Sequence, residues 1–426
     1  MSIDTRRTAV LRRPQLKALL ATAVAELARE PSRGAHAAAR PSLARALHAI
    51  RTHLDMDVAF ISEMVEGRRV FRHVDARPGN DLVQVGNSDP LEDSYCQRVI
   101  DGRLPELMTD ACLNAEALSL PVTRALPVGA HLSVPIRLGD GQLYGTFCCF
   151  SHAPDSSLTA RDLAMMRVFA EMVGEQIQEE LSTRQAIQRL DQRIDTVLER
   201  GGLQMVYQPI FDVLSNRAIG FESLARFSSD PYRSPDVWFS EAAMVNRELE
   251  LESQAIRIAL GALPQLAPDV YIAVNASPEM IVKGDFAGML QGFPLDRIVV
   301  EVTEHQAVER YEDIAAVLSP LQAQGLRVAI DDAGAGYASF RHILNLHPHI
   351  VKLDISITRA IDTDHSRRAL AAALRGFAAE TGCSIVAEGV ETSSELDTLR
   401  GLGIGSAQGY HLGRPMLLQQ ARALIH

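Results

Sequence analysis

Short apolar runs that each end in a polar residue recur through the second half of the chain. Apolar runs of this length are typical of buried strands, and helical stretches separate most of them. Together with an earlier run, QMVYQPIF, they give eight strands, which predicts a TIM-type (β/α)8 barrel over residues 186–426. Such barrels place their catalytic groups where the strands end. The polar residues at these ends are Glu222, Asn275, Glu301, Asp331, Asp332, Lys352, Glu388 and Gln408.

The first two barrel runs are joined without a helix. The segment QMVYQPIFDVLSNRAIGFESLARF has only a Ser-Asn turn between its two apolar runs, which predicts an antiparallel hairpin. We therefore expect an α/β barrel in which one strand runs antiparallel to its neighbours.

The first half of the chain has a mixed pattern. Residues 1–40 are predicted to form a helix and a loose segment, and residues 41–180 an α+β domain around an antiparallel sheet. The turn Gly139-Asp140-Gly141 separates two strand-like runs, which is a good hairpin signal. A long connecting helix without proline follows over residues 159–200 and overlaps both domains.

The long helix carries apolar residues at steps of mostly three and four, as in the seam of a coiled coil. One interpretation is a connector that pairs with its counterpart in a homodimer, because the pattern extends past what one small domain could cover. The other is an amphipathic helix packed on its own domain. The apolar positions, interrupted at residues 182–185, are Met166, Phe169, Val173, Ile177, Leu181, Ile187, Leu190, Ile194 and Val197.

Composition excludes several classes of protein. The formal net charge of −11 at pH 7 argues against a general DNA-binding protein. No apolar run reaches the ~18 residues of a membrane span, and Lys17 and Glu26 break the N-terminal apolar stretch, so a signal peptide is not expected. The five cysteines lack metal-binding spacing, which favours reduced thiols in a cytoplasmic protein.

Carboxylates dominate the predicted strand ends, joined by amides and one lysine. Carboxylate and amide oxygens are hard ligands, which divalent cations prefer. Two such cations can activate a water and clamp both oxygens of a phosphodiester displacement. Glu222, Glu301 and Asp331 are natural ligands, Asp332 can serve a second ion, and Asn275 adds a neutral oxygen that limits the negative charge facing a phosphate.

Eight short motifs make the second half resemble the EAL family of phosphodiesterases, which linearise the bacterial second messenger cyclic di-GMP. The resemblance covers residues 200–420 in the family's order and spacing. It implies cyclic di-GMP as substrate, linear pGpG as product, and two divalent cations, Mg²⁺ or Mn²⁺, with Ca²⁺ inhibitory. The motifs are YQPI, FESLARF, VNAS, EVTE, IDDAGAGYASF, VKLD, AEGVET and QGYHLGRP.

The resemblance also assigns roles to single residues. It makes Glu388 the general base, with Lys352 and Gln408 beside the attacking water. Glu391 has a supporting structural role, and Glu304 anchors the loop that follows the aspartates. The implied cation ligands are Glu222, Asn275, Glu301, Asp331 and Asp332. The implied substrate-side residues are Gln208, Leu224, Arg226, Arg414 and Pro415.

The chain departs from the family pattern at two places. Ser223 replaces alanine in the signature triplet, and we expect little effect because a small residue is kept. Ala333 stands where many members carry phenylalanine, and Ala335 follows in the same loop. Losing the aromatic ring removes a packing anchor, which bears on the order of that loop and on the basal rate.

The first half resembles a GAF sensory domain through SYCQRVIDGRLPELMTDA and LSVPIRLGDGQLYGTFCCF. The resemblance implies regulation by a small ligand or signal whose identity the sequence leaves open. Gln97 follows Cys96, so the Cys-His pair of bilin attachment is absent. The histidines His53, His73 and His131 are expected to be surface or core polar residues and not haem ligands.

Three functions compete. The first is a regulated, cation-dependent cyclic di-GMP phosphodiesterase, which the complete set of acids and the base favours. The second is a non-catalytic cyclic di-GMP receptor, which would typically have lost one of these acids. The third is an unrelated barrel hydrolase such as a glycosidase, for which two acids would suffice and the remaining polar residues would have no role.

Overall fold

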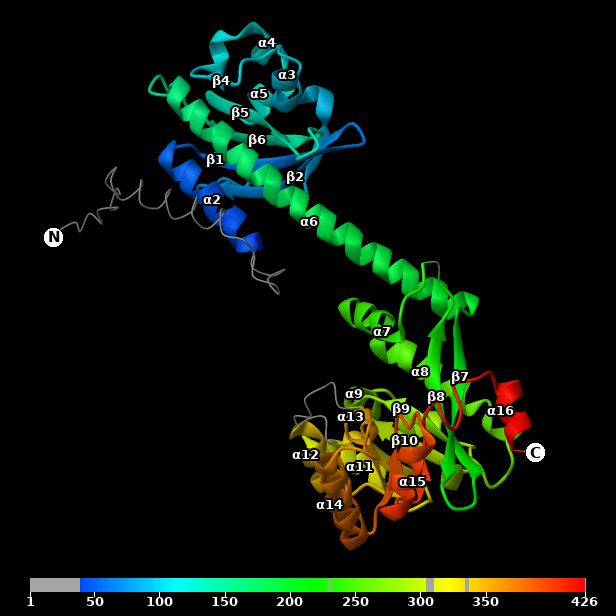
Figure 1. The fold of residues 1–426 in the computed structure, drawn as a ribbon. Coiled ribbons are helices and arrows are strands. Elements are labelled where there is room, and N and C mark those ends of the chain that lie inside the picture. The colour runs from blue at the N-terminus through cyan, green and yellow to red at the C-terminus, as the bar shows by residue number, and fades with distance from the viewer. Residues whose placement is uncertain (1–38, 230, 304–309, 334–336, 426) are drawn as a thin grey trace, which may run out of the picture. The chain divides into compact units, whose positions relative to one another are not determined.

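The structure is a computed structural model that describes the whole chain except residues 1–38, 230, 304–309, 334–336 and 426. Its contacts divide the chain into two compact units, one ending at Gln185 and one running from Ala186 to His426 (Figure 1). The helix predicted near the N-terminus falls in residues 1–38 and so lies outside the described residues.

A six-stranded antiparallel sheet forms the centre of the first unit, in the order β3-β2-β1-β6-β5-β4. Its strands are β1 (Val58–Val65), β2 (Arg68–Ala76), β3 (Ser88–Pro90), β4 (Leu107–Met108), β5 (Ala130–Arg137) and β6 (Leu143–Ser151). Its helices are α2 (Ala39–His53), η1 (Leu91–Asp93), α3 (Tyr95–Ile100), η2 (Ala111–Leu113), α4 (Ala115–Ser119), α5 (Pro121–Ala125) and α6 (Ala160–Arg200). The predicted hairpin is confirmed, since β5 and β6 pair across the Gly139–Gly141 turn.

Strand alternation gives this sheet two apolar faces. Phe60 and Cys148 pack with α3, α4 and α5 on one face, whereas Ile61 and Cys149 pack with α2 and α6 on the other. The sheet is therefore buried on both sides, which explains why its central strands read as continuous apolar runs and not as an alternating pattern.

Helix α6 is continuous over 41 residues, close to the predicted range. Its seam residues are used within the same chain at both ends. Four of them join the core that α6 shares with α2 and are at most 5% exposed: Met166, Phe169, Val173 and Ile177. Two more join the core of the second unit and are also at most 5% exposed: Ile194 and Val197.

This packing corrects the expectation of one continuous seam that faces a second chain. The same apolar stripe serves two cores in turn, which a periodic pattern cannot distinguish from a coiled coil. The stretch between the two cores, residues 182–189, is mostly exposed and includes Ile187, at 40%. A homodimer remains a prediction, and any pairing through α6 has this middle stretch available.

The second unit is a closed barrel with strand order β10-β11-β12-β13-β14-β7-β8-β9. The strands are β7 (Leu203–Asp212), β8 (Arg217–Phe227), β9 (Tyr271–Ala276), β10 (Ile298–Val302), β11 (Arg327–Ala333), β12 (Ile350–Leu353), β13 (Ser384–Ala387) and β14 (Ser406–Ala407). The helices are α7 (Pro235–Met244), α8 (Glu248–Leu260), η3 (Leu263–Gln265), α9 (Pro278–Lys283), α10 (Phe286–Met289), η4 (Leu295–Arg297), α11 (Tyr311–Gln322), α12 (Tyr337–Leu346), α13 (Ile355–Thr358), α14 (His365–Thr381), α15 (Ser393–Gly401) and α16 (Leu418–Leu424).

The predicted reversal of one strand is confirmed. Strand β7 pairs antiparallel with both β8 and β14, while the strands from β8 to β14 pair in parallel. Seven carboxyl ends therefore meet at one end of the barrel. Along the strands, side chains alternate between helices and lumen: Ile272 and Val300 face the helices, and Ala273 and Val299 face inward.

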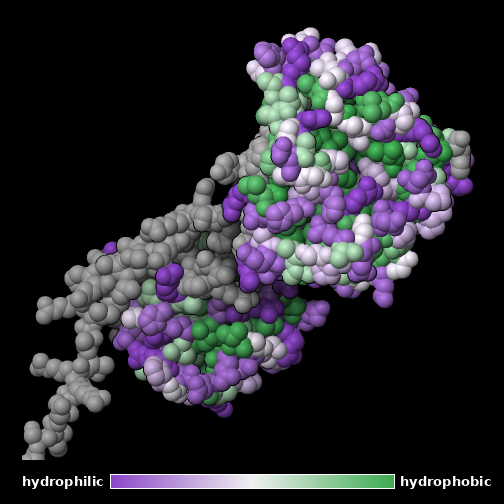
Figure 2. Space-filling model, turned by 90° about the horizontal axis from the view of Figure 1, so that it is seen from below, coloured by the Kyte–Doolittle hydropathy of each residue, from purple (hydrophilic) through white to green (hydrophobic). Residues whose placement is uncertain are grey.

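Of the helices in the described part of the chain, none combines the length and the apolar composition that crossing a membrane requires. On the face drawn in Figure 2, hydrophobic residues lie in patches among hydrophilic ones.

Candidate active site

Strand alternation gathers the predicted site residues at one end of the barrel lumen. Part of an apolar layer inside the barrel is formed by Ala273, Val299, Ala329, Ile350 and Val386. Two positions further along the chain, and so on the same side of each strand, stand in the same order Asn275, Glu301, Asp331, Lys352 and Glu388. Because these strands run parallel, the five polar side chains lie together at the carboxyl end of the barrel.

Lys352 lies at the centre of this polar layer and is 1% exposed. Its Nζ atom is 2.7 Å from Glu301 Oε2 and 2.7 Å from Glu388 Oε1. Two further carboxylates, Asp331 at 3.1 Å and Glu222 at 3.6 Å, complete its surroundings. Burial alone would lower the pKa of Lys352, but these four carboxylates raise it well above its usual value. The buried lysine therefore stays charged and has the partners that a buried charge needs.

The carboxylates outnumber this one ammonium group. Burial raises the pKa of Glu301 well above its usual value, and attraction to Lys352 does not offset burial and the repulsion from neighbouring acids. Burial likewise raises the pKa of Glu388 to about 8, against the opposing attraction of Lys352 and with repulsion from Asp331 and Glu222. Four acids thus face one ammonium group, and burial together with their mutual repulsion favours the protonated forms of Glu301 and Glu388.

Glu222 on β8 contacts site residues from two other parts of the barrel, Asn275 on β9 and Gln408 directly after β14. Gln408 donates from Nε2 to Glu222 Oε2 over 2.7 Å, and Asn275 donates from Nδ2 to Glu222 Oε1 over 3.4 Å. Gln408 is 3% exposed, and its Oε1 atom has no hydrogen-bond partner among the residues that the structure describes. A buried acceptor without a donor is uncommon, and it marks a point where a further group can bind.

The donor set fits divalent cations in its chemistry, through its hard oxygens, its four acids around one ammonium group and the open Oε1 atom of Gln408. Within the described part of the chain, no three acidic, histidine or cysteine side chains are spaced to hold a metal ion as they stand. Glu301 and Asp331 instead turn toward Lys352 Nζ. Cation binding would require these carboxylates to share their oxygens between the ammonium group and the ion.

The second aspartate follows the first along the chain. Asp332 follows Asp331 within β11, and Ala333 ends that strand. Glu304, predicted to anchor the loop, and Ala335 lie outside the described residues. The order of this loop therefore stays a prediction.

The loop after β13 is shaped by sterics around the candidate base. The Thr358 hydroxyl donates to the backbone carbonyl of Glu388. Gly389 has a φ of +66°, and a Cβ atom there would lie 2.4 Å from Ile355 Cγ1. The left-handed φ and the close approach of Ile355 each require glycine at position 389, directly after Glu388.

Glu395 holds the backbone of the same loop through hydrogen bonds. Its carboxylate accepts backbone N–H groups from Ala360 at 2.8 Å, Glu391 at 2.9 Å and Thr392 at 3.0 Å. Ala360 has a left-handed φ of 58°, which is unfavourable for alanine and which this hydrogen bond helps to hold. Glu391 itself pairs with Arg359 at 2.7 Å on the exposed side, which suits a structural role.

The substrate-side candidates lie on β7, β8 and the last loop. Gln208 is the cross-strand neighbour of Glu222 and donates to the carbonyl of Gly413 over 3.3 Å. Leu224 and Arg226 follow Glu222 at steps of two, on the same face of β8. The exposed Arg414 stacks on the Tyr410 ring at 4.3 Å, and the half-buried Pro415 follows it. The fold therefore brings Gln208 and the Gly413–Pro415 segment together across 205 residues of chain.

Two polar contacts near the site were not predicted from the sequence. Ser223, 3% exposed, donates to the carbonyl of Ala273 over 2.7 Å and so bridges β8 and β9. Glu252 on α8 accepts the Ser277 hydroxyl over 2.8 Å, directly after the strand that carries Asn275. Burial raises the pKa of Glu252. No sequence signal separates this glutamate from its neighbours on the same helix.

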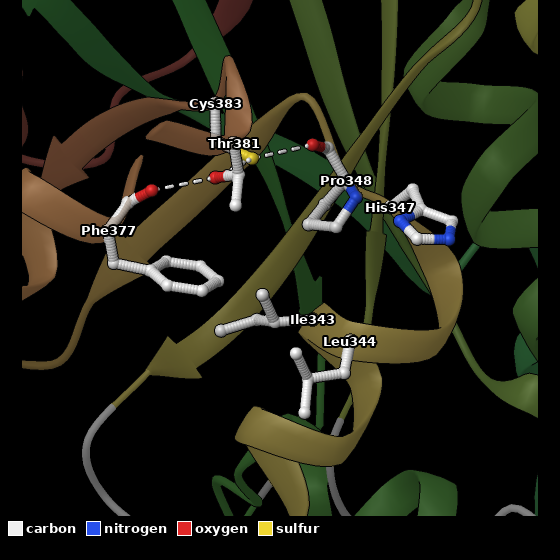
Figure 3. A pocket seen from close by; sticks show the side chains of 7 residues that line it. All are labelled: Ile343, Leu344, His347, Pro348, Phe377, Thr381 and Cys383. Atoms are coloured by element: carbon white, nitrogen blue, oxygen red, sulfur yellow. Dashed lines mark hydrogen bonds between the residues drawn. The ribbon is translucent and has the colours of Figure 1, made fainter. Parts of the chain in front are cut away.

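A separate cavity of about 180 Å³ lies at the other end of the barrel (Figure 3). Its lining residues are Ile343, Leu344, His347, Pro348, Phe377, Thr381 and Cys383. Pro348 precedes β12 and Cys383 precedes β13, so the cavity is at the amino ends of the strands. Polar atoms in its wall bond to each other, as Cys383 Sγ does to the Pro348 carbonyl at 3.0 Å. Barrel chemistry occurs at the opposite end, so we do not assign this cavity to the reaction.

Comparisons with protein families match both halves of the chain. The EAL domain matches residues 187–415, more than half of the chain, and the GAF domain matches residues 40–177. A relative from Pseudomonas aeruginosa, named cyclic di-GMP phosphodiesterase PA2567, is 27% identical over 51% of this chain and 39% of its own length. An uncharacterised protein of Azorhizobium caulinodans is 30% identical over 62% of this chain and 37% of its own length.

The chain spans 37%, 51%, 30% and 39% of the length of four curated relatives, so it corresponds to about a third to a half of each. Among solved structures, the PaMucR phosphodiesterase in complex with c-di-GMP is 26% identical, with a TM-score of 0.50 over 55% of this chain and 99% of that chain. The EAL enzyme Bd1971 with cAMP and cyclic di-GMP bound has a TM-score of 0.54 over 87% of this chain and 93% of that chain. At 17% identity, that likeness concerns the fold alone.

Proposed function

Because this chain belongs to the EAL domain family and carries a GAF domain before its EAL domain, we propose that it hydrolyses cyclic di-GMP to linear pGpG. The observation that carries the proposal is the buried polar layer in which four carboxylates surround Lys352 Nζ within 3.6 Å. The names of PA2567 and of the PaMucR complex, a phosphodiesterase and a c-di-GMP complex, support the choice of substrate.

Substrate binding falls to residues at the rim of the polar layer. Arg226 stands two strand positions beyond Leu224, and its guanidinium group suits a phosphate as a bidentate donor. Gln208 carries an amide that can meet a guanine edge, and its bond to Gly413 fixes the neighbouring Arg414–Pro415 segment beside it. We propose that these residues hold one half of the dinucleotide against the acidic layer.

Glu388 serves as the general base in this proposal. Its Oε1 atom is engaged by Lys352 Nζ at 2.7 Å, which leaves Oε2 to accept a proton from the attacking water. Gln408, fixed on Glu222 through Nε2, directs its unpartnered Oε1 atom to hold that water in line. Two divalent cations, Mg²⁺ or Mn²⁺, would supply the positive charge that the phosphoryl oxygens and the attacking water need.

Glu222, Asn275, Glu301, Asp331 and Asp332 would hold those cations. Four of the acids of the layer already gather around Lys352, and bound cations would favour the charged forms of these acids over the protonated ones. We expect Ca²⁺ to inhibit, because its larger and more flexible coordination shell misplaces the reacting groups.

Regulation by the GAF domain is part of the proposal. The argument is that α6 contributes buried residues to the cores of both units, Ile177 to the first and Ile194 to the second. A signal that changes the packing of one end of α6 therefore has a continuous helix through which to act on the other.

The test is incubation of the full chain with cyclic di-GMP and Mg²⁺ or Mn²⁺, followed by chromatographic analysis of the products. We expect pGpG to accumulate, turnover to stop in excess chelator, and Ca²⁺ to lower the rate. Full turnover in chelator would contradict the cation requirement. Tight binding of cyclic di-GMP without any pGpG would instead favour a non-catalytic receptor.

A further inference from the structure

A buried cluster of polar side chains lies between α3 and the sheet of the GAF domain. Cys96 on α3 and Cys148 on β6 are both 0% exposed, and Arg69 on β2 is 3% exposed. Ser133 Oγ and Thr146 Oγ1 each lie 3.1 Å from Cys148 Sγ. Buried polar groups need polar partners, and each of the two sulfur atoms has at least one here.

The two sulfur atoms face each other. Cys96 Sγ and Cys148 Sγ are 3.6 Å apart, close to van der Waals contact. A disulfide bond is ~2.05 Å long, so the sulfurs need to approach by roughly 1.6 Å. Cys96 is carried by α3, a helix of only six residues, which can accommodate such a shift more easily than the central strand that carries Cys148.

Arg69 makes the two thiols chemically unequal. Its Nη1 atom lies 3.3 Å from Cys96 Sγ, while its Nε atom donates to Asp89 Oδ1 over 2.9 Å. Burial alone would raise the pKa of Cys96, but the hydrogen bond from Cys148 and the charge of Arg69 lower it to about 5. Burial raises the pKa of Cys148 well above its usual value, and its contact with Cys96 raises it further. The guanidinium group against Cys96 Sγ thus favours the charged form of Cys96 over that of Cys148.

We propose that Cys96 and Cys148 form an oxidisable pair, in which Cys96 attacks a hydroperoxide and Cys148 then closes an intramolecular disulfide. The geometry behind the proposal is the facing pair of sulfurs with a guanidinium group against one of them. The GAF domain then carries a covalent modification site for peroxide, independent of any activity of the barrel.

The chemistry balances in two steps. In the first, the Cys96 thiolate attacks the terminal oxygen of the hydroperoxide, the O–O bond breaks, and the leaving alkoxide or hydroxide takes up the proton that the Cys96 thiol released on ionisation. This leaves a sulfenic acid on Cys96. In the second, Cys148 sulfur attacks Cys96 sulfur, the S–O bond breaks, and hydroxide leaves with the proton of Cys148 as water. The peroxide is reduced, and the two thiols are oxidised to one disulfide.

Three other cysteines serve as controls in the same chain. Cys149 is equally buried but points to the opposite face of the sheet, into the core with α2 and α6. Cys112 is exposed, and Cys383 is half-buried in the barrel. Selective linkage of Cys96 to Cys148 would therefore reflect their placement and not the general reactivity of thiols.

The experiment exposes the reduced full chain to graded hydrogen peroxide. The remaining thiols are blocked with N-ethylmaleimide in denaturant, and the protein is digested without reduction for mass spectrometry. We expect a linked pair of peptides containing Cys96 and Cys148, lighter than their sum by two hydrogens, with Cys149 recovered as its maleimide adduct. Recovery of both Cys96 and Cys148 as maleimide adducts, at a peroxide concentration that has oxidised Cys112, would overturn the proposal.

Two variants sharpen the test. In Cys148→Ser, the linked peptides should disappear and Cys96 should accumulate as sulfinic acid, whereas Cys149→Ser should form the Cys96–Cys148 linkage as the wild type does. In Arg69→Met, linkage at pH 7 should be at least ~10-fold slower, because the thiolate loses its counter-charge. An unchanged rate in Arg69→Met would refute Cys96 as the attacking thiolate. The wild-type mapping decides the pairing even where a variant fails to fold.

Discussion

Lys352 Nζ and Glu388 Oε1 lie 2.7 Å apart inside the barrel lumen. The pair joins two neighbouring parallel strands, since Lys352 is in register with Val386, two residues before the glutamate. The lysine holds one oxygen of the candidate base and leaves the other available. Its charge also lowers the pKa of Glu388 and so opposes burial, although burial still raises that pKa to about 8.

Substituting the base should separate catalysis from cation binding. In Glu388→Gln we expect the rate of pGpG formation to fall by ~10²-fold or more, the usual loss for a general base. Mn²⁺ affinity, measured by calorimetric titration, should stay close to that of the wild type. Glu380→Gln, on the exposed side of α14, serves as the matched control and should keep the full rate. A wild-type rate in Glu388→Gln would refute the base assignment.

Removing the buried ammonium group should have opposite effects on cation binding and rate. Lys352→Met leaves four carboxylates without their shared counter-charge, so Mn²⁺ should bind more tightly and raise the melting temperature by more than in the wild type. The rate should nevertheless fall by ~10²- to 10³-fold, because the lysine no longer positions Glu388. Weaker Mn²⁺ binding in this variant would show that Lys352 supports the cations instead of competing with them.

Glu395 should stabilise the barrel in a pH-dependent manner. Burial opposes ionisation, but three backbone N–H groups lower the pKa of Glu395 below its usual value. A lowered pKa contributes stability above the unfolded value of ~4.3, and this contribution is lost as pH falls through the folded value. Glu395→Gln should therefore cost about 1–3 kcal/mol in urea unfolding at pH 7. The difference from wild type should shrink below pH ~4.

Asp397→Asn is the matched control on the same helix. Its side chain is 68% exposed and pairs with Arg400 on the surface. Such pairs contribute about 0–1 kcal/mol, so the substitution should change stability little at either pH. Equal losses in the two variants would contradict the role of Glu395.

His131 should make the GAF domain sensitive to acid. Burial, followed by the charge of Arg69, lowers the pKa of His131 to about 3. Between this value and the unfolded value of ~6.5, only the unfolded state binds the proton, so stability falls as the pH falls. The loss should be about 1.4 kcal/mol per pH unit below pH ~6. His131→Phe should flatten this part of the profile in denaturant unfolding, and an unchanged slope would contradict the burial of a neutral ring.

The exposed middle of α6 should carry any dimer contact through this helix. Ile187→Asp should lower the dimer fraction in sedimentation experiments without loss of helical circular dichroism, because Ile187 is 40% exposed within the chain. Gln188→Asp adds the same charge one position away and should leave the dimer fraction unchanged. By contrast, Ile177→Asp places a charge in the core of the first unit and should unfold it. Equal dimer fractions for Ile187→Asp and the wild type would exclude this surface.

Local patterns in the chain were enough to predict the barrel and its polar residues. Each apolar run is long enough for a strand, and the polar residue at its end stands out, as Glu301 does after IVV and Lys352 after IV. The antiparallel β7 could be predicted because a turn too short for a helix joins it to β8. The hairpin of β5 and β6 followed from glycine in a tight turn.

Other features had no local signal. The seam of α6 looks like one stripe in the sequence, and only the packing shows that Ile177 and Ile194 serve different cores. Glu252 and Glu395 are acidic residues on helices with several others, and only the fold shows which backbone groups they accept. Likewise, nothing in the sequence pairs Cys96 with Cys148 across 52 positions.

The sequence by itself therefore determined the strands, the reversed hairpin and the polar residue types, because period, turn chemistry and side-chain charge are local properties. The tertiary structure alone decided which groups touch. Closure of the barrel brings Gln408 to Glu222, and parallel pairing places Lys352 among acids from four other strands or strand ends. The physical reason is that contacts, burial and the resulting pKa shifts depend on distances between chain segments far apart in sequence, which no local pattern encodes.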